Sequence, residues 1–357
     1  MELEVDSTGL FARPLSPHAM DVLTAVRGVR KIMQASSRNS ETDVDIAILS
    51  WNRPDETIEA VASALSQTGV ARKVLIVDQG SEASNLARLR AYCDNKPDVV
   101  LKCLPANVGV AEGRNVAIAL GSAPFIIGLD NDAVFTDDGV AARAVQRMRA
   151  EPRLGIIAFR ILDFDTREET HWDYPESYRN APVDSFETTR FLGGGQAIRR
   201  DAFEAVGGYD AALFFIGEER DISWRILNAG YRIKWFRDLG ILHHEDASQK
   251  VTWTHRRYYF TVRNTLYINY KFGMAWWRLA RATAAFWVRG VSNGLLGAAV
   301  QGTLASVGMI WRFVRLSPNK APYRLSADVR RYIRETDQEG RRTLVQRLRR
   351  MFARLPH

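Results

Sequence analysis

The chain has 357 residues, of which 46% are hydrophobic and 25% are charged, so it can bury one large core and still carry appendages. Its two cysteines, Cys93 and Cys103, have the spacing of neither a disulfide framework nor a metal site, which suits a reducing cytoplasm. The net charge of +8 raises nucleic acid as a partner, but the excess lies outside the predicted α/β core and no nucleic-acid-binding motif accompanies it. We therefore expect no nucleic-acid partner.

Residues 1–42 predict an extension that precedes the main fold. The first 20 residues lack a positive start followed by an apolar block, so we expect no signal peptide. Residues 20–33 have the composition of a short basic helix, and a polar run at 36–42 follows.

Residues 45–104 predict strands that alternate with helices. The apolar run at 45–51 is followed by a loop at 52–54 and by apolar positions at helical spacing in 56–66. The pattern repeats as a strand at 73–77 that ends on Asp78, a helix over 85–93 and a third strand at 99–104. Such alternation favours a parallel α/β sheet, which binds ligands at the carboxyl ends of its strands.

Residues 107–120 predict a glycine-containing turn followed by an apolar helix over 116–120. Arg114 would open this helix, where its guanidinium and the nearby backbone amides suit a diphosphate. The alternative is a solvated arginine at a helix start. Trp51, Asp78, Arg114 and Asp130 would all lie at the carboxyl ends of the strands.

The apolar run at 125–129 stops on two carboxylates, Asp130 and Asp132, which is the most informative feature of the sequence. A buried strand can deliver acids to the rim of a sheet in this way, and hard oxygen ligands two residues apart suit Mg²⁺ or Mn²⁺ beside a diphosphate. A strand end followed by an Asx-type turn is the alternative.

Acidic and glycine-rich segments follow in the second half. The glycines at 193–195 let the backbone approach a ligand closely, and a strand resumes at 196–198. Glu218, Glu219 and Asp221 precede a helix expected over 222–228, in which Arg225 has the i, i+4 spacing for an ion pair with Asp221. A solvated acidic helix start is the alternative. The unpatterned residues 163–190 predict a mobile loop, with 171–174 covering substrate or contacting the acceptor.

Beyond residue 272 the composition changes. Tryptophans and arginines project to opposite sides of a helix over 274–288, which is typical of a membrane-surface helix or of a helix packed on the catalytic domain. Residues 290–311 carry no charge, but their polar residues and glycines make a weak span. We expect a monotopic attachment, with a single spanning helix as the alternative. The arginine-rich tail at 324–357 would attract anionic lipid or keep a helix soluble.

In their order along the chain, eight segments resemble the nucleotide-sugar-dependent glycosyltransferases of family 2, which have the GT-A fold and transfer with inversion. They are ILSWNRP at 48–54, IVDQGS at 76–81, NVGVAEGRN at 107–115, GLDNDA at 128–133, FLGGGQAIRRDAFEAVGGYD at 191–210, IGEERDISWRILNAGYRI at 216–233, LHHEDAS at 242–248 and YYFTVRN at 258–264. The last segment resembles bacterial rhamnosyltransferases. The resemblance implies an α/β, Rossmann-like and mainly parallel sheet flanked by helices over 43–272, between the extension at 1–42 and a C-terminal helical, membrane-associating region at 273–357.

The resemblance also implies roles for individual residues. Trp51 would stack on the nucleotide base, Asp78 would accept its imide proton and Asp130 would meet the ribose. The full donor site would be Ser50, Trp51, Asn52, Asp78, Arg114, Asp130 and Asn131. Asp132 would hold Mg²⁺ or Mn²⁺ with His243 as a further ligand, and the acceptor side would be Gly194, Gly195, Trp224 and Arg225. A core aromatic, a loop acid and a packed or surface histidine are the alternatives for Trp51, Asp78 and His243.

Inverting transfer requires a base that takes a proton from the acceptor hydroxyl, usually a carboxylate. The family usually has Glu-Asp at this point, with the second acid as the base and another Asp two residues later. Glu219 therefore stands where an aspartate is expected. The prediction is Glu219 as the base, with Asp221 or Glu218 as possible substitutes.

Together these features predict an inverting, metal-dependent hexosyl or rhamnosyl transferase. The donor would be a dTDP- or UDP-sugar, the acceptor a hydroxyl of a glycan or lipid-linked acceptor in cell-surface polysaccharide synthesis, and the location the cytoplasmic membrane surface. A non-catalytic nucleotide-sugar-binding membrane assembly protein is the rival that Glu219 keeps open. A dinucleotide-dependent oxidoreductase is disfavoured because no G-x-G-x-x-G follows the first strand.

Overall fold

The computed structural model describes residues 3–5, 12–14, 42–169, 183–244, 253–316 and 323–336. The expected helix at 20–33, the expected loop at 171–174 and the tail beyond 336 lie outside these described residues. Residues 1–41 and 42–357 form two separate compact units. In the first unit, β1 (Leu3–Val5) and β2 (Ala12–Pro14) pair in antiparallel orientation, with Glu4 opposite Arg13.

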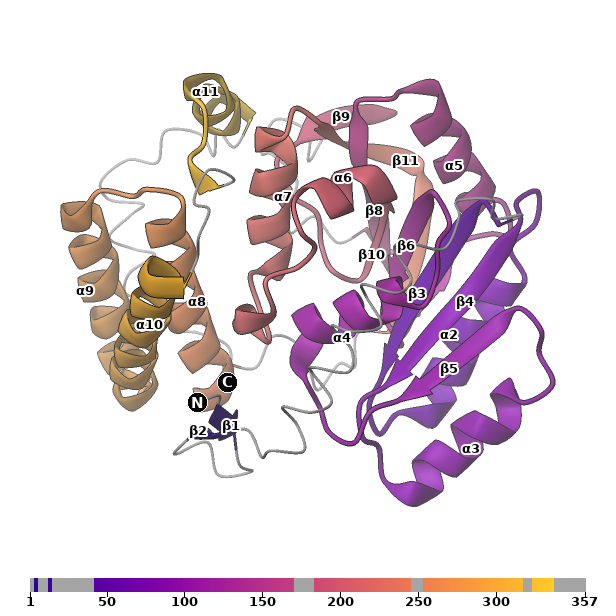
Figure 1. The fold of residues 1–357 in the computed structure, drawn as a ribbon, viewed down its shortest axis with the longest axis horizontal. Helices are drawn as coiled ribbons and strands as arrows, with labels where there is room; N and C mark the ends of the chain where they lie inside the picture. Colours follow the sequence, from indigo (N-terminus) through magenta and orange to yellow (C-terminus); the bar gives the residue numbers. More distant parts are fainter. Residues whose placement is uncertain are drawn as a thin grey trace. The chain divides into compact units, whose positions relative to one another are not determined.

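The second unit is built on a mixed sheet that contains nine strands in the described residues (Figure 1). The strands are β3 (Val44–Ser50), β4 (Arg72–Asp78), β5 (Val99–Cys103), β6 (Phe125–Leu129), β7 (Ala133–Phe135), β8 (Leu154–Asp163), β9 (Ser185–Thr188), β10 (Gly195–Arg199) and β11 (Arg232–His243). Their order is β5-β4-β3-β6-β10-β8-β11-β7, and β9 pairs with β11 outside this path. Strands β3 to β6 run parallel, whereas β10 is antiparallel to both of its neighbours.

Helices complete the second unit. They are α2 (Pro54–Leu65), α3 (Ala83–Cys93), α4 (Gly109–Ala119), α5 (Val140–Ala150), α6 (Arg200–Ala205), the 3₁₀ helix η2 (Ala211–Leu213), α7 (Glu218–Asn228), α8 (His255–Lys271), α9 (Trp276–Ser292), α10 (Leu296–Leu316) and α11 (Ala327–Thr336). The strands and helices expected between residues 45 and 104, and the strand expected at 196–198, are confirmed.

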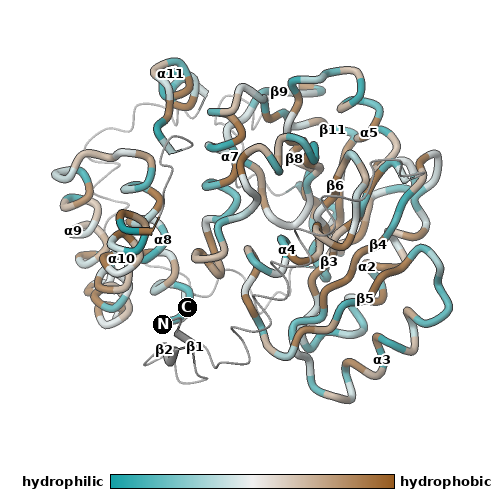
Figure 2. The backbone as a smooth tube through the Cα atoms, in the orientation of Figure 1, coloured by the Kyte–Doolittle hydropathy of each residue, from teal (hydrophilic) through white to brown (hydrophobic). Residues whose placement is uncertain are grey.

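The core lies where α2 and α5 cover the sheet. Strands β3, β4 and β6 bury almost all of their side chains, as parallel strands covered on both faces do. Figure 2 colours much of β3 and β4 brown, in keeping with this burial. One cluster of buried apolar side chains joins these strands to α2 and α5. The rigid sheet thus fixes the loops at its carboxyl edge.

Helix α4 begins earlier than the sequence pattern indicates. The helix expected over 116–120 starts at Gly109, so Arg114 lies inside it and not at its start. Gly109 has a φ of +86°, and a Cβ there would lie 2.5 Å from the carbonyl oxygen of Phe214. A Cβ on Gly113 would lie 3.0 Å from Gln79 Oε1. The two glycines therefore mark a helix start and a close helix contact. Similarly, the helix expected over 222–228 begins at Glu218.

The uncharged run at 290–311 is divided between two helices. Helix α9 ends at Ser292, the chain turns at Gly294 with a φ of +68°, and α10 begins at Leu296. Within the ranges that the structure describes, no helix has the length and apolar character needed to cross a membrane. The alternative of one helix over 290–311 is also wrong, because α9 ends at Ser292 and α10 begins at Leu296.

Candidate active site

The strand register brings four segments to one edge of the sheet. They are the loops that follow β3, β4 and β6 and the glycine loop that precedes β10. Strands β3 and β4 end together, with Ser50 opposite Asp78, and the last residue of β6, Leu129, lies opposite both Ile48 and Gly195. Because β10 is antiparallel to β6, the glycines before it lie at the carboxyl end of β6. The sequence-predicted residues of these loops are thus brought to a common edge.

The loops after β3 and β4 are joined by hydrogen bonds. The backbone N–H of Asn52 donates to Ser81 Oγ at 2.8 Å, and that of Glu82 donates to Asn52 Oδ1 at 2.8 Å. Asp78 is buried and accepts from the backbone N–H of Ser81 at 3.0 Å. Trp51 is 48% exposed, so the alternative of a core aromatic is wrong. These contacts leave an exposed aromatic ring beside a buried carboxylate.

Arg114 is buried and contacts two acids and a backbone carbonyl from three segments. Its Nη2 donates to Asp130 Oδ1 at 2.9 Å and to the carbonyl oxygen of Gly193 at 2.8 Å, and its Nη1 lies 3.8 Å from Glu218 Oε1. Burial disfavours the charged guanidinium, yet the nearby acids outweigh burial and raise the pKa of Arg114. The alternative of a solvated arginine is therefore wrong.

Asp132, which follows β6, and His243, the last residue of β11, lie close together. His243 Nε2 is 3.3 Å from Asp132 Oδ1, and Arg53 Nη1 donates to Asp132 Oδ2 at 2.8 Å. Ligand atoms of Asp130, Asp132 and His243 all lie within 4.8 Å of one another. Burial would raise the pKa of Asp132, but His243 and Arg53 outweigh burial and lower it. An ionised carboxylate beside an imidazole is a donor set that suits a divalent cation.

Two glutamates at the start of α7 face this edge. A Cβ on Gly193 would lie 2.7 Å from Glu219 Oε1 and 3.0 Å from Arg114 Nη2, so only glycine allows the carboxylate to approach. Burial raises the pKa of Glu219, and Arg114 opposes the rise. Burial and the charge of Glu219 raise the pKa of Glu218 to about 8. A pKa of about 8 keeps most of Glu218 neutral near pH 7.

Asp221 and Arg225 have different surroundings. The i, i+4 ion pair between them is confirmed, at 2.6 Å. Both residues are buried, and the second oxygen of Asp221 lies 2.6 Å from Lys271 Nζ. Burial would raise the pKa of Asp221, but Arg225 and Lys271 outweigh burial and lower it. Trp224, half-buried, packs edge-on against Phe272, with ring centroids 5.0 Å apart. These residues are thus occupied by internal contacts.

The remaining predicted residues line the same edge. Ser50 Oγ accepts from Thr57 Oγ1 at 3.2 Å, and Asn131 Nδ2 donates to the same Thr57 oxygen at 3.4 Å. Gly194 and Gly195 are buried against β11, where Cβ atoms would meet His243 at 3.4 Å and Ile241 at 2.8 Å.

Sequence reasoning missed three residues that contact the site: Arg53, Ser81 and Lys271. The first two stand inside motifs that were recognised, so their positions were available although their contacts were not. Lys271 carries no such signal, because its partner Asp221 lies 50 residues earlier in the chain.

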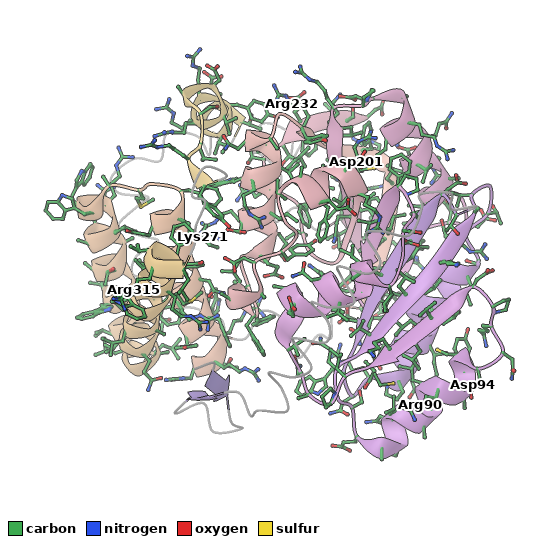
Figure 3. The ribbon with its side chains drawn as sticks, in the orientation of Figure 1. Arg90, Asp94, Asp201, Arg232, Lys271 and Arg315 are labelled. Atoms are coloured by element: carbon green, nitrogen blue, oxygen red, sulfur yellow. The ribbon has the colours of Figure 1, made fainter. Side chains whose placement is uncertain are left out.

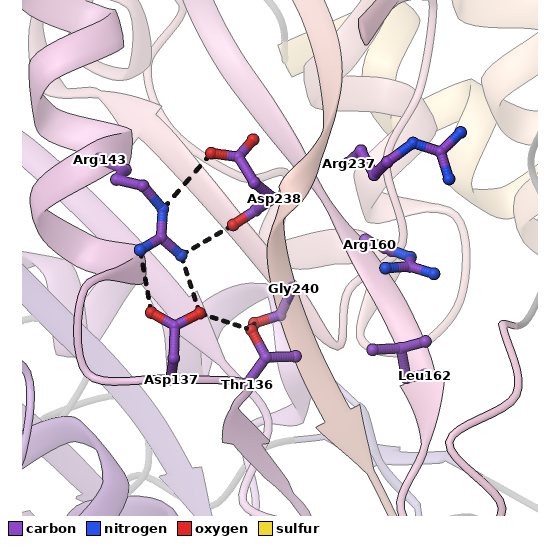
Figure 4. Close-up of a pocket in the computed structure, with 8 residues that line it drawn as sticks. All are labelled: Thr136, Asp137, Arg143, Arg160, Leu162, Arg237, Asp238 and Gly240. Atoms are coloured by element: carbon purple, nitrogen blue, oxygen red, sulfur yellow. Dashed lines mark hydrogen bonds and ion pairs between the residues drawn. The ribbon is translucent and has the colours of Figure 1, made fainter. Parts of the chain in front are cut away.

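A separate cavity of about 540 Å³ lies beside β11 and β8 (Figure 4). Its lining consists of Thr136, Asp137, Arg143, Arg160, Leu162, Arg237, Asp238 and Gly240. Arg143 lies on one side of it, contacting Asp137 at 2.8 Å and Asp238 at 3.4 Å. None of these lining residues belongs to the predicted site, so the cavity is distinct from the edge described above.

Comparisons with known proteins agree with this geometry. Residues 45–207 match the model of the family described as glycosyl transferase family 2. Over 200 residues the chain is 24% identical to the pre-mycofactocin glycosyltransferase of Mycobacterium tuberculosis, which covers 53% of this chain and 40% of that protein. It is 28% identical over 125 residues to a succinoglycan biosynthesis protein of Rhizobium meliloti, covering 35% of each. The chain thus spans well under half of the length of either relative.

Among solved structures, the fold is similar to that of a mannosyltransferase from Pyrobaculum calidifontis in complex with GDP-Man and Mn²⁺. The TM-score is 0.50 at 15% identity, and the match covers 88% of this chain and 93% of that one. The chain therefore carries a glycosyl transferase family 2 domain with a fold like that of GT-A glycosyltransferases. The family resemblance is confirmed, whereas its rhamnosyltransferase detail stays a prediction.

The raised pKa of Glu218 predicts a pH-dependent stability difference. Between an ordinary pKa of 4.5 and about 8, the unfolded chain releases this proton whereas the folded protein keeps it. The stability that neutral Glu218 contributes is thus lost as the pH rises toward 8. The unfolding free energy of Glu218→Gln relative to wild type should increase by up to about 1.4 kcal/mol per pH unit from pH 5 to 8, then level off.

Urea unfolding at several pH values measures this difference. Glu335→Gln, which changes an exposed glutamate of α11 outside the site, is the matched control and should show no such trend. A difference between Glu218→Gln and wild type that stays constant from pH 5 to 9 would contradict the raised pKa.

Proposed function

We propose that the protein is an inverting, metal-dependent glycosyltransferase that acts on a nucleotide-diphosphate sugar. The observation that carries the proposal is the meeting, at one edge of the sheet, of an exposed aromatic ring, a carboxylate–imidazole pair and a buried arginine that contacts the glutamate-bearing segment. Its acceptor would be a hydroxyl of a glycan or lipid-linked acceptor in cell-surface polysaccharide synthesis. The naming of one relative as a succinoglycan biosynthesis protein supports that role.

The donor contacts follow from the loops after β3 and β4. Trp51 would stack on a base, and Asp78 would accept the imide proton that uracil and thymine share, which favours a UDP- or dTDP-sugar. Asn52, held by Ser81 and Glu82, would keep the Trp51 loop in place. Asp130 would contact the ribose, with Arg114 fixing its orientation through the 2.9 Å bond. A hexosyl or rhamnosyl group would be transferred.

Mg²⁺ or Mn²⁺ would be held by Asp132 and His243. The contacts of Asp132 fit this role. Its carboxylate already accepts a hydrogen bond from the Arg53 guanidinium and lies beside the imidazole of His243. A bound divalent ion would neutralise the charge that develops on the departing diphosphate. Arg53 would then give up its bond to Asp132 and contact a phosphate oxygen in its place.

Glu219 is the base in this proposal. It would take the proton of the acceptor hydroxyl while the hydroxyl oxygen attacks the anomeric carbon, and the diphosphate would leave from the opposite face of the sugar. Asp221 is unsuited to this step, because it is buried and both of its oxygens contact cations. Glu218 is unsuited near pH 7, because its raised pKa of about 8 keeps it protonated.

Paired substitutions test the base. Glu219→Gln should lower turnover by about 10²- to 10⁴-fold, the usual contribution of a general base, without loss of donor binding. Glu218→Gln resembles the protonated side chain and should keep turnover within a few-fold at pH 7. Transfer of radiolabelled sugar measures turnover, and nucleotide titration measures donor binding.

The opposite ranking of the two variants would move the base to Glu218. A wild-type protein that binds a donor but neither transfers nor hydrolyses its sugar would favour the non-catalytic nucleotide-sugar-binding membrane assembly protein. Glu219 in place of the usual aspartate is the feature that supports this rival.

We also propose that α9 and α10 bind the cytoplasmic membrane surface. Large apolar side chains lie exposed along both helices, from Trp276 at 80% exposure to Trp277, Trp287, Leu304, Val307 and Trp311. Trp287 Nε1 donates to Thr303 Oγ1 at 3.1 Å, so α9 and α10 are in contact at this exposed tryptophan. Residues 253–316 contain nine lysines and arginines and no acid. Exposed tryptophans on a cationic region suit anionic lipid.

Vesicle binding tests this surface. The double variant Trp277→Ser, Trp311→Ser should bind phosphatidylglycerol vesicles at least about tenfold more weakly, because burying each large apolar side chain is worth ~1.5–3 kcal/mol. Val100→Ser, which changes an exposed apolar residue on β5, should bind as the wild type does. Unchanged binding by the double variant, or equal wild-type binding to neutral and anionic vesicles, would contradict the proposal.

A further inference from the structure

The segment that leads into α7 has an unusual backbone. Residues 213–217 run from the last residue of η2 to the residue before α7, and within them Phe214, Ile216 and Gly217 have φ angles of +60°, +69° and +94°. A bulky or β-branched residue rarely adopts a positive φ, and each such residue costs about 1–3 kcal/mol. The surrounding structure must therefore supply contacts that hold this conformation.

Asn264 of α8 supplies the most direct of these contacts. Its side chain is buried, and its Nδ2 lies within hydrogen-bond distance of three carbonyl oxygens, those of Leu213 at 2.9 Å, Phe215 at 2.8 Å and Ile216 at 2.7 Å. The neighbouring Arg263 donates to Leu213 O at 2.8 Å and to Asn264 Oδ1 at 2.8 Å, which fixes the orientation of the amide. The backbone carbonyl groups of this segment thus accept hydrogen bonds from side chains of α8.

The same segment also touches the start of α4. The backbone N–H of Val110 donates to Phe214 O at 2.6 Å, and Gly109 leaves room for the ring of Phe214. The conformation of residues 213–217 is thereby coupled to the helix that carries Arg114. Asn264 holds the other side of the segment.

A second contact from α8 reaches α7 itself. Lys271 lies seven residues, two helical turns, after Asn264 and so projects from the same face of α8. Figure 3 labels this lysine. Its buried Nζ contacts Asp221 Oδ1 at 2.6 Å and Asp210 Oδ2 at 2.5 Å, and Arg225 holds the other oxygen of Asp221. Asp221, two residues after Glu219, is thus fixed from both sides.

We propose that Asn264 and Lys271 are positioning residues for Glu219. Asn264 fixes the backbone just before α7, and Lys271 fixes the first turn of the helix through Asp221. Together they hold the Glu219 carboxylate at Gly193, beside Arg114. This inference rests on the proposed function for its catalytic meaning, because it takes Glu219 as the base.

The test compares variants of α8 in the full-length protein. Asn264→Ala removes the donor to the 213–217 segment, and Lys271→Met removes the charge with little change in volume. Tyr258→Phe is the matched control, because it removes a buried hydrogen bond from the same helix, 2.8 Å to Phe286 O, that leads to α9 and not to α7. Amide hydrogen exchange over residues 213–221 and sugar transfer are measured for each variant.

Asn264→Ala should accelerate exchange over residues 213–221 and lower kcat by about 10²-fold, the usual cost of a displacement of about 1 Å, with donor affinity within about twofold of wild type. The acidic limb of its kcat–pH profile should move to higher pH, because Glu219 would lose the Arg114 charge that opposes its raised pKa. Lys271→Met should also accelerate exchange over residues 213–221 and lower kcat, but by less, since Arg225 still holds Asp221. Tyr258→Phe should leave exchange in this segment, kcat and the pH limb unchanged.

Unchanged exchange over 213–221 in folded Asn264→Ala and Lys271→Met would overturn the proposal. So would a loss of kcat that Tyr258→Phe reproduces without a shift of the pH limb, because that result indicates only a loss of folded protein. If Asn264→Ala does not fold, Lys271→Met decides by the same criteria. A wild-type protein that is inactive with every donor would overturn the proposed function instead, and the exchange data would still show whether α8 holds the segment.

Discussion

The guanidinium of Arg114 joins three segments that are distant in the chain. It contacts the carboxylate that follows β6, a carbonyl group of the glycine loop before β10, and an acid at the start of α7. A buried charge is costly unless partners surround it, so these contacts depend on one another. Removal of any one partner would leave a buried charge in this cluster without an opposite charge or hydrogen bond to stabilise it. The edge of the sheet therefore holds buried acids whose pKa values burial raises, and Glu218, with a pKa of about 8, favours the neutral form.

The contacts of α7 extend this dependence to the C-terminal helices. Helix α8 contacts the 213–217 segment and Asp221 with one face, while Tyr258, Val262 and Leu266 of another face pack with α10. Gly302 permits this packing, because a Cβ there would lie 2.7 Å from Tyr259 O. The same helix thus contacts the acids of the candidate active site and the helices proposed to bind lipid. Helix α8 therefore links Asp221, beside the candidate active site, to the helices proposed to bind lipid.

Local sequence signals predicted much of the fold. The alternation of apolar strands with helical spacing gave the units between residues 45 and 104, since both periodicities are local. The i, i+4 pair of Asp221 and Arg225 was likewise visible, because four residues make one helical turn. The start of α4 was not, because Gly109 and Gly113 resemble turn residues until the contacts with Phe214 and Gln79 are known. The turn at Gly294 was not predicted either, because a glycine within the uncharged run at 290–311 does not by itself indicate a helix end.

The sequence could propose most residues of the candidate site, whereas it indicated few of the contacts between them. Asp130 and Asp132 could be recognised because they end an apolar strand, whereas the burial of Arg114 depends on partners 16 and 79 residues away. The resemblance to family 2 supplied the roles of Trp51, Asp78 and Glu219, which spacing alone did not. No local signal indicated that Lys271 would fix Asp221.

Metal-dependent binding of nucleotide sugars tests the central claim most directly. Calorimetric titration of the protein with UDP-, dTDP- and GDP-sugars, with and without Mn²⁺ or Mg²⁺, would be compared with Asp132→Ala and with Asp94→Ala, an exposed control on the far end of α3. We predict metal-dependent binding of a UDP- or dTDP-sugar that Asp132→Ala abolishes and Asp94→Ala retains. Absence of binding by every donor in the presence of either metal, or undiminished binding by Asp132→Ala, would contradict the proposed site.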